Sequence, residues 1–373
     1  MREDETPRGA DAQDAPIGER GESIVTLLVP AVVFVVAAVA VYLAGVLLSD
    51  TTDILTVRWG LGEELGGLVL LAIVTNLPEV VITTSAALGG TLSLAIGNIL
   101  GGVAIQVVVL VYLDVVVGDS ETLTYRAASL VLVLEGLVVI VILLTVIAGS
   151  QLPETLVFER VTPPELLIAL LWVGGIWLVS KARTGLPWHG QGTPPDAQLE
   201  PRGVARREKL TQIEGYTATH TLTVFLLAAG VTLAGGIALE RSSSMLADGF
   251  GVSGAVFGAT VLAAVTSLPE ISTGAAAVRL GDYQLAVSDI FGGNAFLPVL
   301  FLLASVLSGN AVLPALSSTN IYLACLGGLL TAVYLAGLIF RPRYLIARLG
   351  LDSLVVLVLY LSGILGLAFI VAA

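Results

Sequence analysis

The sequence predicts an all-α polytopic membrane protein of about ten transmembrane helices, arranged as two inverted repeats of five helices each. This prediction comes from the composition, the number of long apolar stretches and a motif that occurs twice. Hydrophobic residues make up 56% of the 373 residues, charged residues only 12%, and the mean hydropathy is +0.96. Because a soluble protein carries about 25% charged residues, this composition indicates a lipid environment.

A transmembrane helix needs roughly 20 mainly apolar residues, and the chain holds about ten such stretches. Residues 1–23 are expected to form an acidic N-terminal tail without the apolar core of a signal peptide, so we expect the first apolar stretch to be retained. The expected helices span residues 24–47, 61–88, 93–116, 127–148, 164–180, 219–239, 251–280, 284–307, 319–339 and 352–372.

Residues 181–218 form a long polar segment in the interior of the sequence and are rich in glycine and proline. Such a segment cannot bury enough apolar surface to fold alone, so we expect a flexible linker. The linker divides the chain into a first half, residues 24–180, and a second half, residues 219–373. Each half contains five expected helices.

The two halves repeat one another. Residues 72–79 (Ala-Ile-Val-Thr-Asn-Leu-Pro-Glu) align with residues 263–270 (Ala-Ala-Val-Thr-Ser-Leu-Pro-Glu) at an offset of 191. The same offset aligns residues 98–102 with residues 289–293, each ending in Gly-Gly. Five helices separate matching positions, and an odd number reverses the direction through the membrane. Inverted repeats of this kind are typical of secondary transporters that bind their substrate near the bilayer midplane.

The strongest candidates for chemistry are Glu79 and Glu270. An acid at the centre of a transmembrane helix costs about 2.5–3.5 kcal/mol, so it normally faces a cavity or a partner. Pro78 and Pro269 precede the two acids and interrupt the helical hydrogen bonds. Such irregular backbone is tolerated in the membrane only where it lines a cavity or packs against protein. The structural alternative is a pair of proline kinks with hydrogen-bonded acids.

Further oxygen atoms accompany the two acids. Thr75 and Thr266 lie four residues before the glutamates and share their helix face. One turn further back, Ala72 and Ala263 leave room beside them. Carboxylates, hydroxyls and freed carbonyls make an oxygen-only site, which suits hard cations such as Ca²⁺ and Na⁺. Softer metals prefer Cys or His, whereas Cys325 stands alone and both histidines fall in or beside the linker.

A second polar stripe begins the following helix in each half. Asn98, Gly102 and Gln106 are four residues apart and therefore share a helix face. In the second half, Asp289 and Gly293 occupy the first two of these positions. The glycines are explained equally well by helix packing. An acid such as Asp289 within an apolar segment favours a functional role.

Three other acids are less informative. Glu135 lies in an apolar stretch without a counterpart in the other half. Three roles are open for it: a proton carrier, the partner of a buried polar group, or a side chain that reaches the inner membrane interface. Asp114 and Asp282 lie near expected helix ends and are expected to be solvated.

The Thr-x-Leu-Pro-Glu and Gly-Asn-x-x-Gly segments resemble the α-repeats of the cation/calcium antiporter superfamily, particularly the sodium/calcium exchangers. The resemblance covers residues 67–106 and 258–297. It implies that the two glutamates coordinate Ca²⁺ and Na⁺, helped by hydroxyls and backbone carbonyls of the same motifs. Together with the residues above, the candidate cation ligands are Glu79, Glu270, Thr75, Thr266, Ser267, Asn76, Ala72, Ala263, Asn98, Asp289 and Gln106.

The sequence departs from the family pattern at several positions, which leaves the identity of the ions open. Asn76 replaces a serine of the first motif, and Asp289 occupies the asparagine position of the second repeat. The other departures are Val74 and Val265 for glycine, Gly102 and Gly293 for serine, Val103 for asparagine, and Gln106 and Leu297 for a following Asn or Asp.

We therefore expect a secondary antiporter of the cell membrane that exchanges Ca²⁺ for Na⁺ by alternating access. Its partners are inorganic cations and the lipid bilayer. We expect no nucleic acid, no prosthetic group and no enzymatic activity. A proton-coupled or monovalent cation exchanger of the same fold is the nearest alternative, with Asp289 or Glu135 as the proton carrier. An intramembrane hydrolase would need a second deep aspartate or a serine with a base, and a channel would need no counter-ion.

The distribution of basic residues predicts the orientation in the membrane. With ten helices and both termini outside, the inner connections carry 12 of the 17 lysines and arginines and the outer side carries five. Because basic residues accumulate in cytoplasmic loops, residues 181–218 are expected to be cytoplasmic. In a Cys325→Ala background, an impermeant thiol reagent added to intact cells should label Gly9→Cys and spare Gly192→Cys. Labelling of Gly192→Cys from outside would contradict the predicted orientation.

Overall fold

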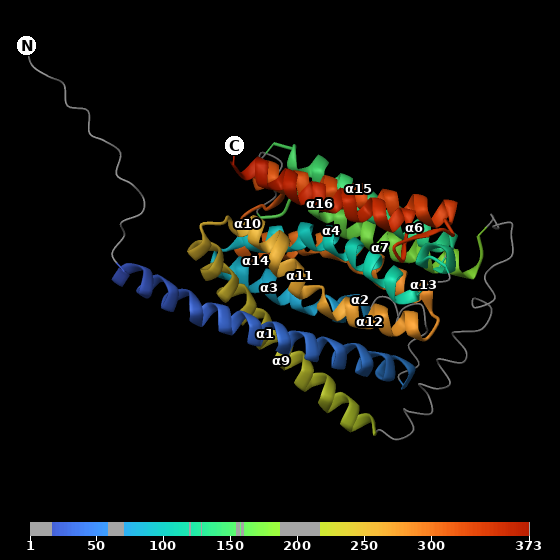
Figure 1. Cartoon of the computed structure of the whole chain (residues 1–373), viewed down its shortest axis with the longest axis horizontal. Helices are drawn as coiled ribbons and strands as arrows, with labels where there is room; N and C mark the ends of the chain where they lie inside the picture. Colours follow the sequence, from blue (N-terminus) through green and yellow to red (C-terminus); the bar gives the residue numbers. More distant parts are fainter. Residues whose placement is uncertain are drawn as a thin grey trace, which may run out of the picture.

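The computed structural model describes residues 17–58, 71–118, 121–127, 129–153, 157, 160–186 and 217–372. Within these residues the chain is helical apart from loops and one two-stranded hairpin, β1 (Leu345–Ile346) and β2 (Leu349–Gly350). Nine helical segments of the described chain are long and apolar enough to cross a membrane. The predicted all-α polytopic membrane fold is confirmed (Figure 1).

In the first half, the long helices α1, α4 and α6 and the interrupted helix α2–α3 precede the last span, α7. A single long helix, α1, opens the described chain, and the apolar stretch that follows is split. The elements are α1 (Ile17–Arg58), α2 (Leu71–Thr75), α3 (Leu77–Gly89), α4 (Leu92–Val117), α5 (Leu123–Ala127), α6 (Leu130–Ser150) and α7 (Pro163–Thr184).

The second half follows the same order with more interruptions. Its second span contains a π-helical turn, and its third is broken by a 3₁₀ turn at Pro298. The elements are α9 (Ala218–Phe250), α10 (Gly254–Phe257), η4 (Gly258–Leu262), α11 (Ala263–Thr266), α12 (Leu268–Arg279), α13 (Tyr283–Phe296), η5 (Leu297–Val299), α14 (Leu300–Ser308), η6 (Leu313–Ala315), α15 (Ser318–Phe340) and α16 (Leu351–Ala372).

The observed boundaries differ from the predicted ones in several places, including the ends of α1 at Arg58 and of α9 at Phe250, which lie 11 residues beyond the predicted ends. Helix α1 begins at Ile17, inside the predicted tail 1–23, and α7 continues to Thr184, inside the predicted linker. Residues 1–16, and residues 187–216 of the predicted linker, lie outside the described residues. The predicted helix 61–88 is interrupted at Asn76, and its first ten residues also lie outside the described part.

The backbone itself repeats at the offset of 191. Helix α4 (Leu92–Val117) and the helical segment Tyr283–Ser308 begin and end at equivalent positions of the two repeats. Gly90 and Gly281, which occupy matching positions after α3 and α12, have φ angles of 82° and 78°. Gly118 and Gly309, also a matching pair, have φ angles of 104° and 75°. Only glycine adopts such angles without strain, so the repeat extends to the turns between helices.

The two halves interlock rather than lying side by side. Helix α4 of the first half packs against α10, η4, α11 and α12 of the second half, while α13 packs against α2 and α14 against α3. Helices α1 and α9 pack along each other on one side of the bundle, opposite α15 and α16 (Figure 1). The interrupted helices therefore lie in the middle of the protein.

Two matching glycines bring α1 and α9 close to the interrupted helices. A methyl group at Gly45 of α1 would lie 2.8 Å from Cγ of Pro269, in the first turn of α12. A methyl group at Gly236 of α9 would lie 2.7 Å from Cγ1 of Val81 in α3. Small residues that permit such approach are typical of helix packing in membranes. Both contacts brace the helices that carry Glu79 and Glu270.

We predict that Gly236→Ala destabilises the protein by about 1–3 kcal/mol, because the added methyl group overpacks the contact with α3. Gly230→Ala on the same helix is the matched control, since no atom lies within 4 Å of its added methyl group. The control should be neutral or slightly stabilising. Thermal unfolding of both variants in detergent measures the difference, and equal midpoints would show that the contact does not constrain α9.

Candidate cation site

The two interruptions deliver the two glutamates to the centre of the protein. Asn76 (φ −87°, ψ 15°) separates α2 from α3, and Ser267 (φ −84°, ψ 2°) separates α11 from α12. A proline follows in the first turn of each new helix, where its missing N–H is tolerated. Glu79 and Glu270 fall in the same first turns. A helix N-terminus favours negative charge, so each break provides a place for a carboxylate.

Both glutamates are buried without a basic partner. Each is 1% exposed, and no lysine or arginine among the described residues pairs with either. Both carboxylate oxygens of Glu270 and Oε2 of Glu79 lack a hydrogen-bond partner within the described part of the chain. The two acids are close enough to interact electrostatically. Because a buried charge is costly unless it is paired, this arrangement suits the binding of a cation.

A threonine of the second half meets polar groups of the first half. The hydroxyl of Thr266 donates a hydrogen bond of 3.3 Å to Oδ1 of Asn98 in α4. The same hydroxyl lies within hydrogen-bonding reach of Glu79. Ser267 donates to the carbonyl of Ala263 at 2.8 Å, which leaves its oxygen lone pairs available. The site is thus assembled from residues of both halves.

Gly293 leaves space for two amides of the opposite half. A methyl group at Gly293 would lie 3.0 Å from Nδ2 of Asn76 and 3.3 Å from Oε1 of Gln106. Both polar atoms of the Gln106 amide are buried and lack a partner among the described residues. The glycine that replaces the family serine therefore gives Asn76 and Gln106 room to approach α13.

Asp289 approaches the site from its edge. It is half-buried on α13, and its Oδ2 accepts a hydrogen bond of 3.0 Å from Thr273 of α12. Thr273 lies one turn after Glu270, and Asp289 is close enough to interact electrostatically with Glu270. At the offset of 191, Thr273 corresponds to Ile82, so this pair of oxygen groups has no equivalent in the first half.

The remaining predicted ligands are placed in the same region of the chain. Thr75 ends α2 and is buried, and Ala263 begins α11 and is buried. Ala72 belongs to α2, but its side chain lies outside the described residues. Sequence analysis missed Thr83, whose buried hydroxyl lacks a described partner. Its position four residues after Glu79, the spacing that selected Thr75, was the available signal.

Asn294 and Glu240 are two further buried groups without an assigned role in the sequence analysis. Asn294 follows Gly293, and both polar atoms of its amide lack a partner in the described chain. Glu240 of α9 accepts hydrogen bonds from Ser85 at 2.8 Å and Thr91 at 2.5 Å. Glu240 thereby ties α9 to α3 and to the turn before α4. No periodic pattern in the sequence connects α9 with that turn.

Two of the less informative acids are now explained. Glu135 forms an ion pair of 3.0 Å with Arg183 at the end of α7, so it is the partner of a polar group rather than an isolated proton carrier. Arg183 also donates to Ser288, the neighbour of Asp289. The prediction that Asp114 is solvated was wrong. Asp114 is buried because the residues around α5 fold over the end of α4.

The sequence matches a known protein family over most of its length. The family model described as "Sodium/calcium exchanger protein" matches residues 29–180 and 220–369. The inner membrane protein YrbG of Escherichia coli (strain K12) is 29% identical over 280 residues, which cover 74% of this chain and 78% of that protein.

Two solved structures share the fold. The H⁺/Ca²⁺ exchanger CAX is 14% identical with a TM-score of 0.64, covering 94% of this chain and 89% of that one. The sodium-calcium exchanger NCX_Mj is 15% identical with a TM-score of 0.54, covering 91% of this chain and 98% of that one.

Proposed function

Because this chain belongs to the sodium/calcium exchanger protein family, we propose that it exchanges Ca²⁺ for Na⁺ across the cell membrane by alternating access. Family membership makes it a multi-pass membrane cation antiporter rather than an enzyme. We also propose that both termini lie outside the cell and that residues 181–218 lie in the cytoplasm.

The observation that carries the proposal is the pair of buried, unpaired glutamates. Glu79 and Glu270 present three carboxylate oxygens without a described hydrogen-bond partner. Two negative charges match one divalent cation, and Ca²⁺ takes six to eight oxygen ligands. The hydroxyls of Thr75, Thr266 and Ser267, the amides of Asn76, Asn98 and Gln106, and the carbonyls of Ala72 and Ala263 are candidates to complete this set.

Sharing the two glutamates makes the exchange obligatory. Ca²⁺ and Na⁺ would both need Glu79 and Glu270, so one cation must leave before the other binds. The empty site would hold two uncompensated charges in a water-excluded interior, which is costly. A conformational change is then favoured only when the site is loaded. This is the requirement for exchange rather than leak.

Proton coupling is the second candidate, and Asp289 is the observation that favours it. The carboxyl group of Asp289 lies at the edge of the site, where Thr273 donates to it. A carboxyl group can carry a proton in one state and accept a cation in the other. The similarity of the fold to both a proton-coupled and a sodium-coupled exchanger is compatible with either ion.

Flux in vesicles with each gradient imposed separately tests the proposal. Purified protein in vesicles loaded with Na⁺ should accumulate Ca²⁺ when external Na⁺ is absent, and a pH gradient alone should drive no uptake. Uptake driven by the pH gradient and not by Na⁺ would replace sodium coupling by proton coupling. Uptake without any counter-ion would reject antiport.

We predict that Glu79→Gln and Glu270→Gln each abolish cation transport without preventing membrane insertion. Removing one carboxylate leaves too little charge to offset the dehydration of a divalent cation. Glu165→Gln is the matched control. Glu165 is equally buried but accepts hydrogen bonds from Ser305 and the backbone of Thr162 outside the site. The control should lose stability but keep its transport rate per folded molecule. Near-normal Ca²⁺ uptake by either site variant would reject the assignment.

We predict that Asp289→Asn preserves Ca²⁺ binding and changes the Na⁺ or pH dependence of exchange. The amide keeps the shape, still accepts from Thr273 and matches Asn98 of the first half, so only a charge or a proton site is lost. Exchange measured over a range of Na⁺ concentrations and pH values checks this. If both profiles coincide with those of the unmodified protein, the role of Asp289 is structural.

A further inference from the structure

A second group of buried acids lies at one end of the bundle, away from the cation site. Asp114 is on α4, eight residues beyond Gln106, which corresponds to roughly 12 Å along a helix axis. Asp352 lies in the first turn of α16. The exchange of ions proposed above does not involve either residue, and the following inference holds whichever ions are exchanged.

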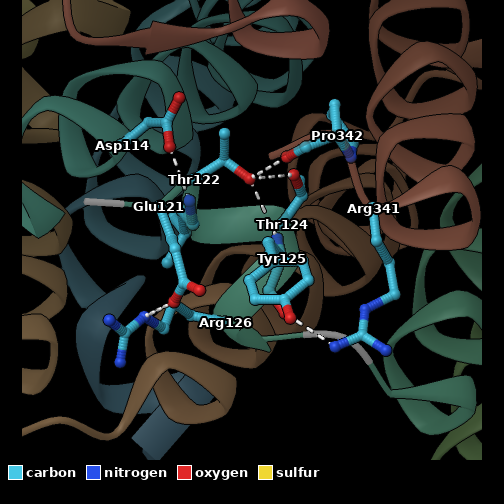
Figure 2. Close-up of polar contacts among 9 residues, drawn as sticks. Asp114, Glu121, Thr122, Thr124, Tyr125, Arg126, Arg341 and Pro342 are labelled. Carbon is cyan, nitrogen blue, oxygen red and sulfur yellow. Dashed lines mark hydrogen bonds and ion pairs between the residues drawn. The ribbon is translucent and has the colours of Figure 1, made fainter. Parts of the chain in front are cut away.

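Asp114 is firmly held by the backbone. Its Oδ1 accepts a hydrogen bond of 2.5 Å from the N–H of Leu123 (Figure 2). Its Oδ2 accepts one of 2.6 Å from the N–H of Gly350. Asp114 is 1% exposed. An ionised carboxylate accepts hydrogen bonds only, and two backbone donors suit that form. Both oxygens of Asp114 are therefore already occupied as acceptors.

Asp352 is buried next to Asp114 and lies near the hydroxyl of Thr124 and the N–H of Ser353 at the start of α16. It is 7% exposed, and neither of its oxygens has a hydrogen-bond partner of good geometry in the described chain. The two carboxylates converge on Gly350. A methyl group there would collide with Oδ1 of Asp352 and lie 3.2 Å from Oδ2 of Asp114. A methyl group at Gly337 of α15 would collide with Oδ2 of Asp352.

Tyr334 supplies an independent sign that a ligand belongs here. It lies on α15 one turn before Gly337, is fully buried, and its hydroxyl has no partner among the described residues. The hydroxyl is close enough to interact electrostatically with both Asp352 and Asp114. Leaving a buried donor unsatisfied costs about 1–3 kcal/mol. The Tyr334 hydroxyl can donate to one oxygen of Asp352, which leaves the other oxygen of Asp352 without a hydrogen-bond partner of good geometry in the part of the chain that is described.

The basic residues of this end of the bundle are turned to other partners. Arg341 donates to the carbonyl of Tyr125 at 3.2 Å (Figure 2). Arg341 and Arg343 both stack on the Tyr125 ring. Arg126 pairs with Glu121 at 2.6 Å.

Arg348, on the same loop as Arg341, is exposed. The other polar groups facing this region are the hydroxyls of Thr122, which donates to Pro342 at 2.6 Å, and Thr124. No described arginine neutralises the second carboxylate.

We propose that Asp352 and Asp114 bind one proton between them and that Tyr334 completes the network. The proton resides on Asp352 and is donated to Asp114, while the Tyr334 hydroxyl donates to the other oxygen of Asp352. This single proton satisfies all three groups and leaves one negative charge. A metal ion fits less well, because both Asp114 oxygens already accept backbone N–H groups and no third acid, His or Cys of the described chain joins the cluster.

The proton site connects pH to the helix that carries part of the cation site. Without the proton, two like charges face each other in a buried place and repel. The start of α16 and the hairpin before it then pack less firmly on α4, which carries Asn98 and Gln106. In the predicted orientation this end of α4 faces the cytoplasm. Cytoplasmic pH would therefore act on exchange without a proton being transported.

Infrared spectroscopy of the purified protein in lipid vesicles tests the proposal without measuring transport. In an Asp289→Asn background, which removes the other candidate proton carrier, the protein should show the C=O band of a protonated carboxyl group that ¹³C labelling of aspartate shifts, which separates it from the glutamates of the cation site. The band should disappear in Asp352→Asn. If no aspartate band is present at any pH at which the protein is folded, or if the band persists in Asp352→Asn, the proposal is overturned.

Tyr334→Phe keeps the test decisive if Asp352→Asn does not fold. Removing the hydroxyl takes a hydrogen bond from the C=O group, so the band should move to higher frequency. Tyr360→Phe on α16 is the matched control and should leave the band in place. An unchanged band in Tyr334→Phe would remove Tyr334 from the network and contradict the proposed assignment.

Discussion

The structure depends on two carboxylates that are buried in the membrane without a fixed positive partner. Glu79 and Glu270 are buried to the same extent, and no described lysine or arginine reaches them. Such a pair is costly unless a cation or a proton neutralises the charge. The interrupted helices, the polar residues around the breaks and the close packing of α1 and α9 against the breaks all serve this one requirement.

The inverted repeat meets this requirement with one motif used twice, and the differences between the copies mark what is specific to this chain. Thr75 and Thr266 are identical at equivalent positions of the two repeats. At another pair of equivalent positions, the first repeat has Asn98 and the second has Asp289. Asn98 accepts from Thr266 of the opposite half, and Asp289 accepts from Thr273 of its own half. The acid therefore belongs to a local pair that only the second half possesses.

The fold could be predicted from the sequence because lipid imposes a minimum helix length and permits few charges. The two breaks were predictable because proline cannot continue a helix. The pairing of Thr266 with Asn98 was not predictable, since they are 168 residues apart and only the interlocking of the halves brings them together. Asp114 was predicted wrongly because a polar residue near a helix end is ordinarily solvated. Here the segment around α5 and the hairpin before α16 cover it.

The interlocking of the halves has a mechanical consequence for the cation site. Asn98 and Glu79 come from the first half, and Thr266 and Glu270 from the second, so a bound cation would link the two. Helices α1 and α9 pack mainly on each other and touch the breaks through glycine contacts at Gly45 and Gly236. At each glycine a side chain of the neighbouring helix, Pro269 or Val81, packs closely against the backbone. Glu240 of α9 also accepts hydrogen bonds from Ser85 and Thr91, so α9 is held beside the helix that carries Glu79.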